Sequence, residues 1–398
     1  MRPCRIAKAC RIAKAAAIAV CLLTAAGQAG PYPPADQKRL PLVLRAHGIF
    51  WAGGRIVNRT QTGTENAGDL KSLPYNQQQV LAGQAYVEYF IPQRLRYGRR
   101  TLPIVMIPGG GLTGVHFLTT PDGREGWAHH FVRRGYPVYV VDVPGRGRAG
   151  FVPDRFNDVR SGAAAPNTQP QLRMWDSSAW LEWNTGPLPA PVPKHGPNDP
   201  NCIGNDARDP DNPSVYCNGN LMPALDEEGY KHWLAALMPE GPVAGGVEPG
   251  IIAALEKIGP AVVIAHSAAG TMGGRIANEK PELFKALIGV EPQGDCNLPP
   301  EVEVKGLAKV PTLSIHGINQ VGRPQTGPCL DTYDKINKAG GDAIYQSLPK
   351  LPRTALYDRI PQVGIWGNDH IMMWNTNSDR IASLLLTWIE QHVERRRR

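Results

Sequence analysis

The chain has 398 residues, of which 42% are hydrophobic, and a formal net charge of +8. Five basic residues in residues 1–29, a segment without Asp or Glu, and the four arginines at 395–398 account for this excess, so the body between them is close to neutral. This composition argues against a disordered chain and against a nucleic-acid-binding protein. The length is sufficient for a large hydrophobic core.

Residues 1–29 have the layout of an export signal. The basic residues precede a mostly apolar run at 15–26, and the small residues Gly27 and Ala29 follow. This run is too short to cross a bilayer, which needs about 20 apolar residues, whereas the order of charged, apolar and small segments is that of a secretory signal peptide. We expect cleavage between Gly27 and Gly30 and a secreted or periplasmic protein. No later apolar run reaches about 18 residues, so no membrane span is expected.

Four cysteines remain after removal of this signal, namely Cys202, Cys217, Cys296 and Cys329. An even number in an oxidising compartment predicts disulfides, although four cysteines allow three pairings. We favour Cys202 with Cys217, which would close a short loop rich in Pro, Asn and Asp, and Cys296 with Cys329. The spacing matches no zinc pattern, and the sequence indicates neither a metal nor another cofactor.

The first part of the body is predicted to be β-structure. Strand-like runs at 47–51 and 55–58 flank Gly53-Gly54, a two-residue signal for a hairpin turn. Further strands are predicted at 84–91 and 102–107.

From residue 127 onward, strands and helices alternate. We predict a helix at 127–134, apolar strands at 137–143, 261–265 and 286–290, further strands at 312–315 and 363–366, and a closing amphipathic helix at 378–393. Continuous apolar strands separated by helices are typical of a parallel sheet that is covered on both faces. The pattern therefore predicts an α/β fold.

Residues 150–250 interrupt this alternation. The stretch 186–220 is dense in Pro, Asn, Asp and Gly and has no apolar period, before helices at 226–237 and 250–258 return the chain to the sheet. Insertions of this length are often functional lids. The predicted organisation is a signal peptide at 1–29, a core formed by 30–149 and 251–398, and a lid at 150–250.

The insertion contains two groups of side chains with more than one interpretation. Its aspartates, Asp199, Asp206, Asp209 and Asp211, could bind calcium through oxygen atoms, but their irregular spacing favours a solvated loop. Its tryptophans are Trp175, Trp180, Trp183 and Trp233. They could line an apolar pocket, and a role in packing the lid is favoured.

The sharpest signal is a serine between an apolar strand and a helix-like run. Ser267 follows the strand at 261–265 and has Ala265 and Ala269 two residues to either side. A nucleophile elbow has this form, usually as G-x-S-x-G, because the tight turn leaves no room for large side chains. As a bare motif, A-x-S-x-A is equally consistent with a serine that caps a helix, since alanine adopts positive φ less readily than glycine.

Two partners for Ser267 follow in the chain order Ser, acid, His. His370, in the loop before the closing helix, is placed to take the serine proton, and Glu291, at the end of an apolar strand, is placed to orient the imidazole. No carboxylate follows the strand at 312–315, where the acid is more common. Asp369 is the competitor for the acid, but it adjoins His370 and is poorly placed to reach the far side of that ring.

The remaining histidines fit the role of base less well. His316 ends a strand too early in the chain, and His266 is expected to pack. His129, His130 and His392 are predicted to be helical and exposed.

An oxyanion needs preorganised N–H donors. The backbone of Ala268 should supply one, and Gly110, in the glycine-rich loop at 107–111, the other. A phosphate-binding loop is disfavoured because no Gly-Lys-Ser/Thr follows the glycines.

Several motifs together resemble a group of secreted bacterial carboxylesterases in the α/β-hydrolase superfamily. They are the segments at 108–114, 119–124, 126–127, 134–136, 145–148 and 367–373, together with Asp142, His266-Ser267 and Glu291-Pro292. The resemblance covers residues 40 to about 389 and is weakest in the insertion. It implies an α/β-hydrolase fold and a triad of serine, a glutamate after the sixth strand, and histidine, which maps onto Ser267, Glu291 and His370. Some members carry a cysteine pair where this chain has Gly110-Gly111, so that stiffening of the loop does not carry over.

The predicted function is a secreted serine carboxylesterase that acts on a small-molecule ester and needs no cofactor. A lactonase or acyltransferase would use the same triad, whereas dehalogenases and epoxide hydrolases need an aspartate at position 267. A non-catalytic binding protein on this fold would be expected to lose a triad residue, and none is missing. Neither a nucleic-acid partner nor a membrane span is expected, and the oligomeric state is left open, a homodimer included.

Overall fold

The computed structural model describes residues 40–60, 77–150, 221–292, 303–318 and 326–394, except positions 224, 226, 242, 244, 352 and 356. Between 151 and 220 it describes residues 156, 158, 159, 162–169, 179, 183 and 185. The predicted signal peptide, the four aspartates of the insertion, Trp175, Trp180, Cys202, Cys217 and Cys296 lie outside the described residues. The two disulfides therefore stay predictions.

A central sheet of eight strands has the order β1-β2-β4-β3-β5-β6-β7-β8. The strands are β1 Leu44–Thr60, β2 Gln77–Pro92, β3 Ile104–Ile107, β4 Val138–Asp142, β5 Ala261–His266, β6 Phe284–Val290, β7 Thr312–His316 and β8 Ala343–Ser347. β2 is antiparallel to β1 and β4, and all pairs from β4 to β8 are parallel. β3 and β5 are buried at every position, as expected for apolar strands covered on both faces.

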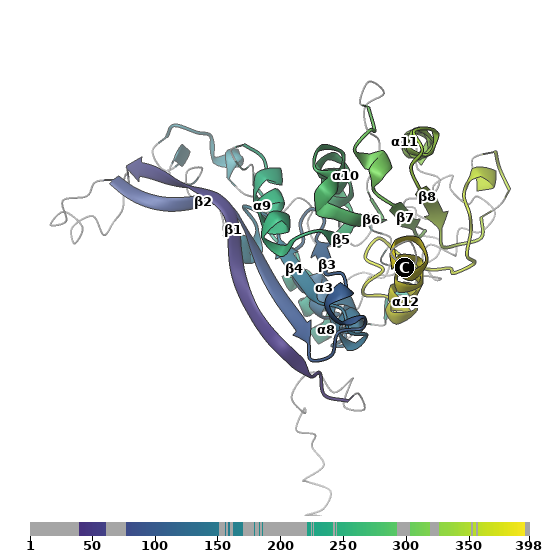
Figure 1. Cartoon of the computed structure of the whole chain (residues 1–398). Helices are drawn as coiled ribbons and strands as arrows, with labels where there is room; N and C mark the ends of the chain where they lie inside the picture. The colour runs from purple at the N-terminus through teal and green to yellow at the C-terminus, as the bar shows by residue number, and fades with distance from the viewer. Residues whose placement is uncertain are drawn as a thin grey trace, which may run out of the picture.

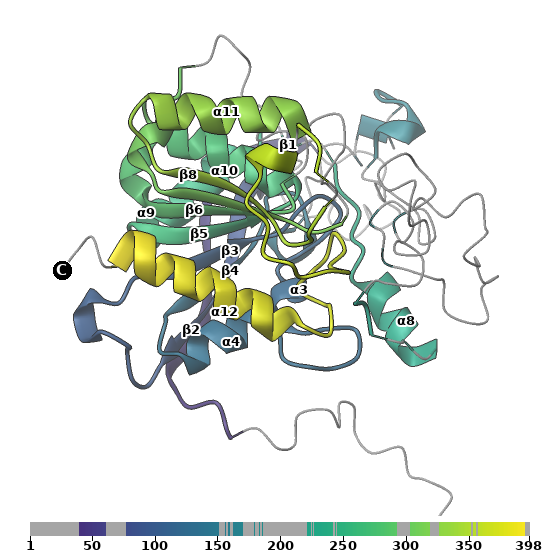
Figure 2. The same cartoon turned by 90° about the vertical axis from the view of Figure 1, so that its right-hand side faces the viewer.

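Helices cover both faces of this sheet (Figure 2). The faces are covered by α4 Trp127–Arg133 and α12 Ser378–Ile389 on one side, and by α9 Glu248–Ile258, α10 Ala268–Glu279 and α11 Thr326–Lys338 on the other. Two further α-helices in the described ranges are α3 Val115–Leu118 and α8 Glu227–Ala235. Short 3-10 helices occur at Gly98–Arg100, Gly147–Ala149, Pro166–Thr168, Pro281–Leu283, Leu307–Lys309 and Tyr357–Arg359, and a π-helical turn at Glu390–Glu394 continues α12. The predicted α/β class is confirmed. None of the helices in the described ranges is long and apolar enough to cross a membrane.

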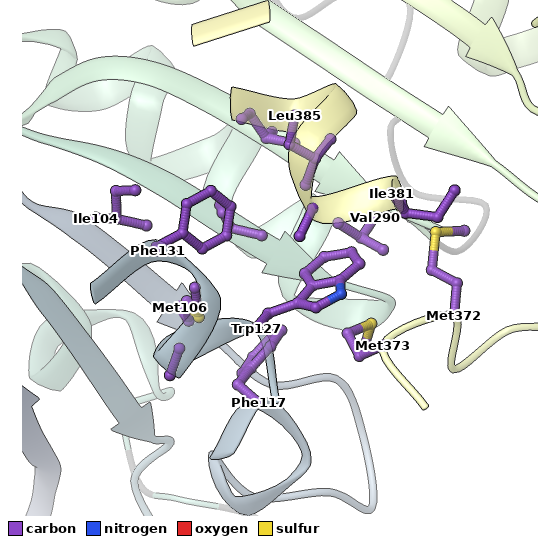
Figure 3. Close-up of a cluster of buried hydrophobic side chains, with 14 of the residues drawn as sticks. Ile104, Met106, Phe117, Trp127, Phe131, Val290, Met372, Met373, Ile381 and Leu385 are labelled. Carbon is purple, nitrogen blue, oxygen red and sulfur yellow. The ribbon is translucent and has the colours of Figure 1, made fainter. Parts of the chain in front are cut away.

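The core between the sheet, α4 and α12 also anchors a loop near the end of the chain (Figure 3). Trp127 of α4 is fully buried, and its indole N–H donates to Ser378 O at 3.0 Å. Met372 and Met373, from the loop before α12, belong to the same buried cluster. His130, predicted to be exposed, is buried, because its ring lies between α4 and α12 with Nε2 3.3 Å from Ser383 Oγ.

The predicted hairpin turn at Gly53-Gly54 is wrong. β1 continues through both glycines and pairs with β2 on either side of them, so that the two strands form one long, curved pair (Figure 1). Gly53 and Gly54 have φ of 66° and 82°, and Gly83 of the partner strand has φ of 81°. Glycine adopts these left-handed conformations without steric cost, so the ladder is distorted here without reversing. Because β2 is long enough to pair with both predicted segments, they do not pair with each other.

The predicted strand at 363–366 is also wrong. Val363 N–H donates to Ser347 O at 3.1 Å and Ile365 N–H to Leu348 O at 2.6 Å, and an isolated bridge joins Ser347 to Gln362, but residues 363–366 form no strand. The strand that pairs with β7 is β8. The sequence of β8 is Ala-Ile-Tyr-Gln-Ser, in which buried and half-buried residues alternate. A short mixed segment of this kind gives a weaker periodic signal than the apolar run at 363–366, and its identity as a strand depends on pairing with β7.

Candidate active site

Ser267 lies at the sharp turn between β5 and α10. β5 ends at His266 and α10 begins at Ala268, so the serine alone makes the connection. Its backbone has φ 53° and ψ −126°, which a residue with a Cβ adopts only when its surroundings impose it. Its N–H donates to Val290 O at 2.9 Å, and its carbonyl accepts from Gly270 N–H at 2.8 Å. These contacts hold the strained conformation of the turn, which has the form expected of a nucleophile elbow.

The alanines of the A-x-S-x-A motif are compatible with this turn because the strain falls on the serine itself. Among the described residues, positive φ outside glycine occurs only at Ser267 and Glu291. The approach that does require a glycine occurs one residue beyond the motif, where a Cβ on Gly270 would lie 2.5 Å from the Cβ of Pro292. Gly270 therefore allows α10 to pack directly on the residue that follows Glu291.

His370 reaches Ser267 from the loop between β8 and α12. Its Nε2 lies 2.9 Å from Ser267 Oγ, and both side chains are buried. The His370 N–H donates to Trp183 O at 3.0 Å. Met372 and Met373, two and three residues further along the chain, are buried in the core. The backbone that carries the imidazole is thus held on both sides.

Glu291, directly after β6, lies on the other side of the imidazole. Its Oε2 is 3.3 Å from His370 Nδ1, its Oε1 accepts from Gly317 N–H, and its own N–H donates to Ile315 O at 2.9 Å. A fully buried carboxylate is costly unless it is hydrogen-bonded, and both oxygens of Glu291 have a partner. The structure brings the three predicted residues together, with Glu291 and not Asp369 beside the ring.

The loop after β7 contributes a backbone donor instead of a carboxylate. A Cβ on Gly317 would lie 2.1 Å from Asn368 O, so only glycine permits this approach to the histidine loop. Ile318 N–H donates to the same carbonyl at 2.8 Å. The position where the acid is more common therefore supplies the N–H that supports Glu291.

Asp369 shapes the histidine loop from within. Its Oδ1 accepts from Ile371 N–H at 2.9 Å and from Asn375 Nδ2 at 3.0 Å, while Asn375 Oδ1 accepts from the N–H of Asp369 at 3.1 Å. Burial raises the pKa of Asp369 to about 8, against the opposing effect of these hydrogen bonds and with a further increase from the Glu291 carboxylate. Asp369 is therefore largely protonated at neutral pH.

Three neutral histidines surround the catalytic candidates. Burial lowers the pKa of His266 and of His116 well below the usual 6.5, and that of His316 to about 3. His266 Nε2 donates to His370 O at 2.8 Å, and the two rings lie 4.9 Å apart. The sequence predicted only packing for His266. Its hydrogen bond to the His370 backbone has no sequence signal, because the two residues are 104 positions apart.

The predicted oxyanion donors come from two segments next to Ser267. Ala268 is the first residue of α10, where N–H groups have no acceptor within the helix. Gly110 follows Gly109, which is so close to the serine that a Cβ on Gly109 would lie 2.5 Å from Ser267 Cβ. A helix N-terminus together with a glycine loop is the arrangement that oxyanion holes use.

Two tryptophans of the insertion pack against the site. The Trp183 ring lies 5.9 Å from that of His370 and 6.1 Å from that of Trp233 in α8. Both tryptophans belong to the buried core. They therefore pack the insertion onto the histidine loop, which is the favoured of the two roles expected from the sequence.

The architecture defines the fold class of the protein. A mostly parallel eight-stranded sheet with helices on both faces, and a serine at the turn after a central strand, is the α/β-hydrolase fold. The fold predicted from the sequence is thus confirmed. No protein-family model matches the chain.

Proteins similar to the chain include a bacterial esterase and a probable secreted lipase. The structure described as "The Atomic Resolution Structure of a Novel Bacterial Esterase" is similar with a TM-score of 0.69 and 28% identity, over 89% of this chain and 98% of that chain. The probable secreted lipase phiG of Fungal sp. (strain ATCC 74256) is 28% identical over 351 residues, which are 77% of this chain and 85% of the relative. The chain is therefore an α/β-hydrolase superfamily member with esterase and lipase relatives.

Replacing Asp369 by Asn should remove a pH dependence of stability while keeping the loop. The amide oxygen can still accept from Ile371 and Asn375. Between pH 3.8 and about 8 the folded protein holds the Asp369 proton and the unfolded chain does not, so stability from this group is full at low pH and is lost as the pH rises through that window. Urea unfolding at about pH 5, 7 and 9 should show Asp369→Asn gaining stability relative to wild type as the pH increases. A difference that stays constant with pH would contradict the raised pKa of Asp369.

Proposed function

We propose that the protein is a serine ester hydrolase that acts through an acyl-enzyme. The observation that carries this proposal is the buried sequence of contacts from Ser267 Oγ to His370 Nε2 at 2.9 Å and from His370 Nδ1 to Glu291 Oε2 at 3.3 Å. A serine hydroxyl is a weak nucleophile unless a base takes its proton, and the base needs a third group to hold it in the correct tautomer. In this proposal His370 is the base beside the nucleophile Ser267, and Glu291 is the acid that orients His370.

In the first half of the reaction, Ser267 Oγ attacks the ester carbonyl carbon while His370 Nε2 takes its proton. Glu291 accepts the Nδ1–H of His370 and stabilises the imidazolium that forms. The carbonyl oxygen becomes an oxyanion, which the N–H groups of Gly110 and Ala268 would bind. The intermediate then collapses, the bond to the alcohol breaks, and His370 returns the proton to the alkoxide, leaving the acyl group on Ser267.

In the second half, water replaces the alcohol. His370 takes a proton from the water as its oxygen attacks the acyl carbon, and the same donors would bind the second oxyanion. Collapse breaks the bond to Ser267 and returns the proton to Oγ. The products are a carboxylic acid and free enzyme.

The substrate class that we propose is a small carboxylic ester. The similarity to a bacterial esterase and to a probable secreted lipase supports ester hydrolysis. A lactonase or an acyltransferase uses the same triad and differs in the group that leaves or attacks, so product analysis separates them. A non-catalytic binding protein is separated by its failure to react with a serine-directed probe.

Replacing Ser267 by Ala should abolish both hydrolysis and covalent labelling. We expect hydrolysis of a p-nitrophenyl ester to fall by about 10⁴-fold or more, since loss of the nucleophile disables the whole triad, and a fluorophosphonate probe should no longer attach. Ser383→Ala removes a hydroxyl from α12, away from the triad, and should behave as wild type. Undiminished hydrolysis by a folded Ser267→Ala protein, or wild type that fails to label, would overturn the proposal.

The choice of acid can be tested by comparing Glu291→Gln with Asp369→Asn. Glutamine cannot stabilise an imidazolium and favours the wrong tautomer, so we expect kcat to fall by about 10³- to 10⁴-fold. Asp369→Asn keeps a neutral group in place and should retain most of the activity at pH 7. Steady-state kinetics of both purified variants decide the matter, and the reverse ranking would assign the acid to Asp369.

We also propose that the protein is exported, which the secreted relative supports. When the full chain is expressed in a bacterium, the intact mass of the protein recovered from the periplasm or medium should lack residues 1–27, 1–28 or 1–29. Deleting residues 1–29 should keep the protein in the cytoplasm. Exported protein that still begins at Met1 would contradict a cleaved signal.

A further inference from the structure

The glycine loop after β3 is held by side chains that lie outside the triad. Arg146, in the turn after β4, donates from Nη1 to the carbonyls of Gly109 and Leu112, the latter at 3.1 Å. Glu240, at the end of the insertion, accepts from Gly111 N–H at 3.0 Å. The two side chains also meet each other, with Nη2 of Arg146 3.2 Å from Oε2 of Glu240.

Backbone contacts complete this arrangement. Met238 N–H, two residues before Glu240, donates to Gly111 O at 2.8 Å. Gly109 O, both polar atoms of Gly111 and Leu112 O therefore each have a partner from the turn after β4 or from the insertion. Gly110 lies between these fixed points.

The turn that carries Arg146 is itself closely packed on the following part of the loop. Gly147, with φ 53°, would place a Cβ 2.4 Å from Thr113 Cγ2. Asp142, which is fully buried, accepts from Gly114 N–H at 2.7 Å through Oδ1 and from Arg148 N–H at 2.9 Å through Oδ2. The base of the Arg146 side chain is thus fixed relative to the loop that its guanidinium binds.

We propose that Arg146 and Glu240 are positioning residues that hold the 109–112 loop so that Gly110 N–H points at the oxyanion. This inference rests on the proposed function and extends it, because it makes the insertion part of the catalytic framework. An oxyanion hole works only if its donors are already in place when charge develops. A guanidinium that binds two carbonyls in a fixed geometry, and a carboxylate that binds both the guanidinium and an amide, supply that rigidity.

The kinetic consequence differs from that of a residue that binds substrate. Loosening the loop weakens contacts made in the transition state and leaves ground-state binding nearly intact, so kcat should fall while KM changes little. For Glu240→Ala we expect kcat to fall by about 10- to 100-fold, because a misplacement near 1 Å has an effect of that order. Fluorophosphonate labelling should slow in parallel, since the phosphoryl oxygen occupies the same position as the oxyanion.

Conservative variants separate the two contacts of Glu240. Glu240→Gln retains an oxygen that can accept from Gly111 N–H and loses the charge that faces Arg146, so its kcat should lie between those of wild type and Glu240→Ala. Arg146→Lys keeps the charge but has no fork to span two carbonyls, and should lose about as much kcat as Glu240→Ala. These variants also keep the proposal testable if Glu240→Ala does not fold.

Glu125→Ala is the matched control. Glu125 binds Arg133 at 2.8 Å through Nε, and the exposed fractions of this pair, 20% and 21%, are close to the 24% and 12% of Glu240 and Arg146. The Glu125→Ala variant should lose an ion pair of the same kind, and its kcat should not change. If Glu240→Ala and Glu125→Ala have the same kcat and the same labelling rate, the proposal is overturned.

Hydrogen exchange measured by mass spectrometry gives a readout that does not depend on catalysis. The amide of Gly111 should exchange faster in Glu240→Ala than in wild type or Glu125→Ala, because its acceptor is gone. If the wild-type protein neither hydrolyses esters nor labels, the proposed function fails and with it the catalytic part of this inference. The exchange rate then still decides whether Glu240 orders the loop, and an unchanged rate would overturn that part as well.

Discussion

Ser267 and Glu291 hold left-handed backbone conformations at the ends of two adjacent strands, and much of the surrounding structure serves to impose them. Such conformations at residues with a Cβ cost of order 1–3 kcal/mol each and persist only where the surroundings determine them. β5 and β6 are parallel and in register up to His266 and Val290, which places the next residue of each strand side by side. Because Gly270 has no Cβ, α10 packs directly on Pro292, and this contact connects the turn at Ser267 with the turn at Glu291.

The charge distribution around Ser267, Glu291 and His370 follows from burial. Glu291 is fully buried, and its carboxylate accepts hydrogen bonds from a backbone amide and from the His370 ring. His116, His266 and His316 are kept neutral, because burial lowers the pKa of each, and Asp369 is largely neutral because burial raises its pKa. Among the side chains named here, the His370 imidazolium of the proposed mechanism is therefore the positive charge that interacts with the Glu291 carboxylate.

The insertion is part of the framework of the site as well as a candidate cover for it. Trp183 accepts the N–H of His370 through its carbonyl, and Leu221 forms hydrogen bonds to both Gly367 and Thr376, one on each side of the histidine loop. In the glycine loop, Gly111 O accepts from Met238 N–H, and Gly111 N–H donates to the Glu240 carboxylate. Both loops that would contact the reacting carbonyl thus depend on contacts with Trp183, Leu221, Met238 and Glu240.

The sequence alone determined the α/β class, most of the strands and helices, and the candidates Ser267, Glu291 and His370. It could do so because apolar periodicity and the order of residues at predicted strand ends can be recognised without knowing which segments contact each other. Only the tertiary structure decided the path of β1 through Gly53-Gly54, the identity of β8, the burial of His130, and the contacts of His266 and of Arg146 with Glu240. Each of these depends on a partner far away in the sequence, such as Glu240 for Gly111. The residues of a segment limit the contacts that it can make, and the packing of the whole chain determines which of these contacts form.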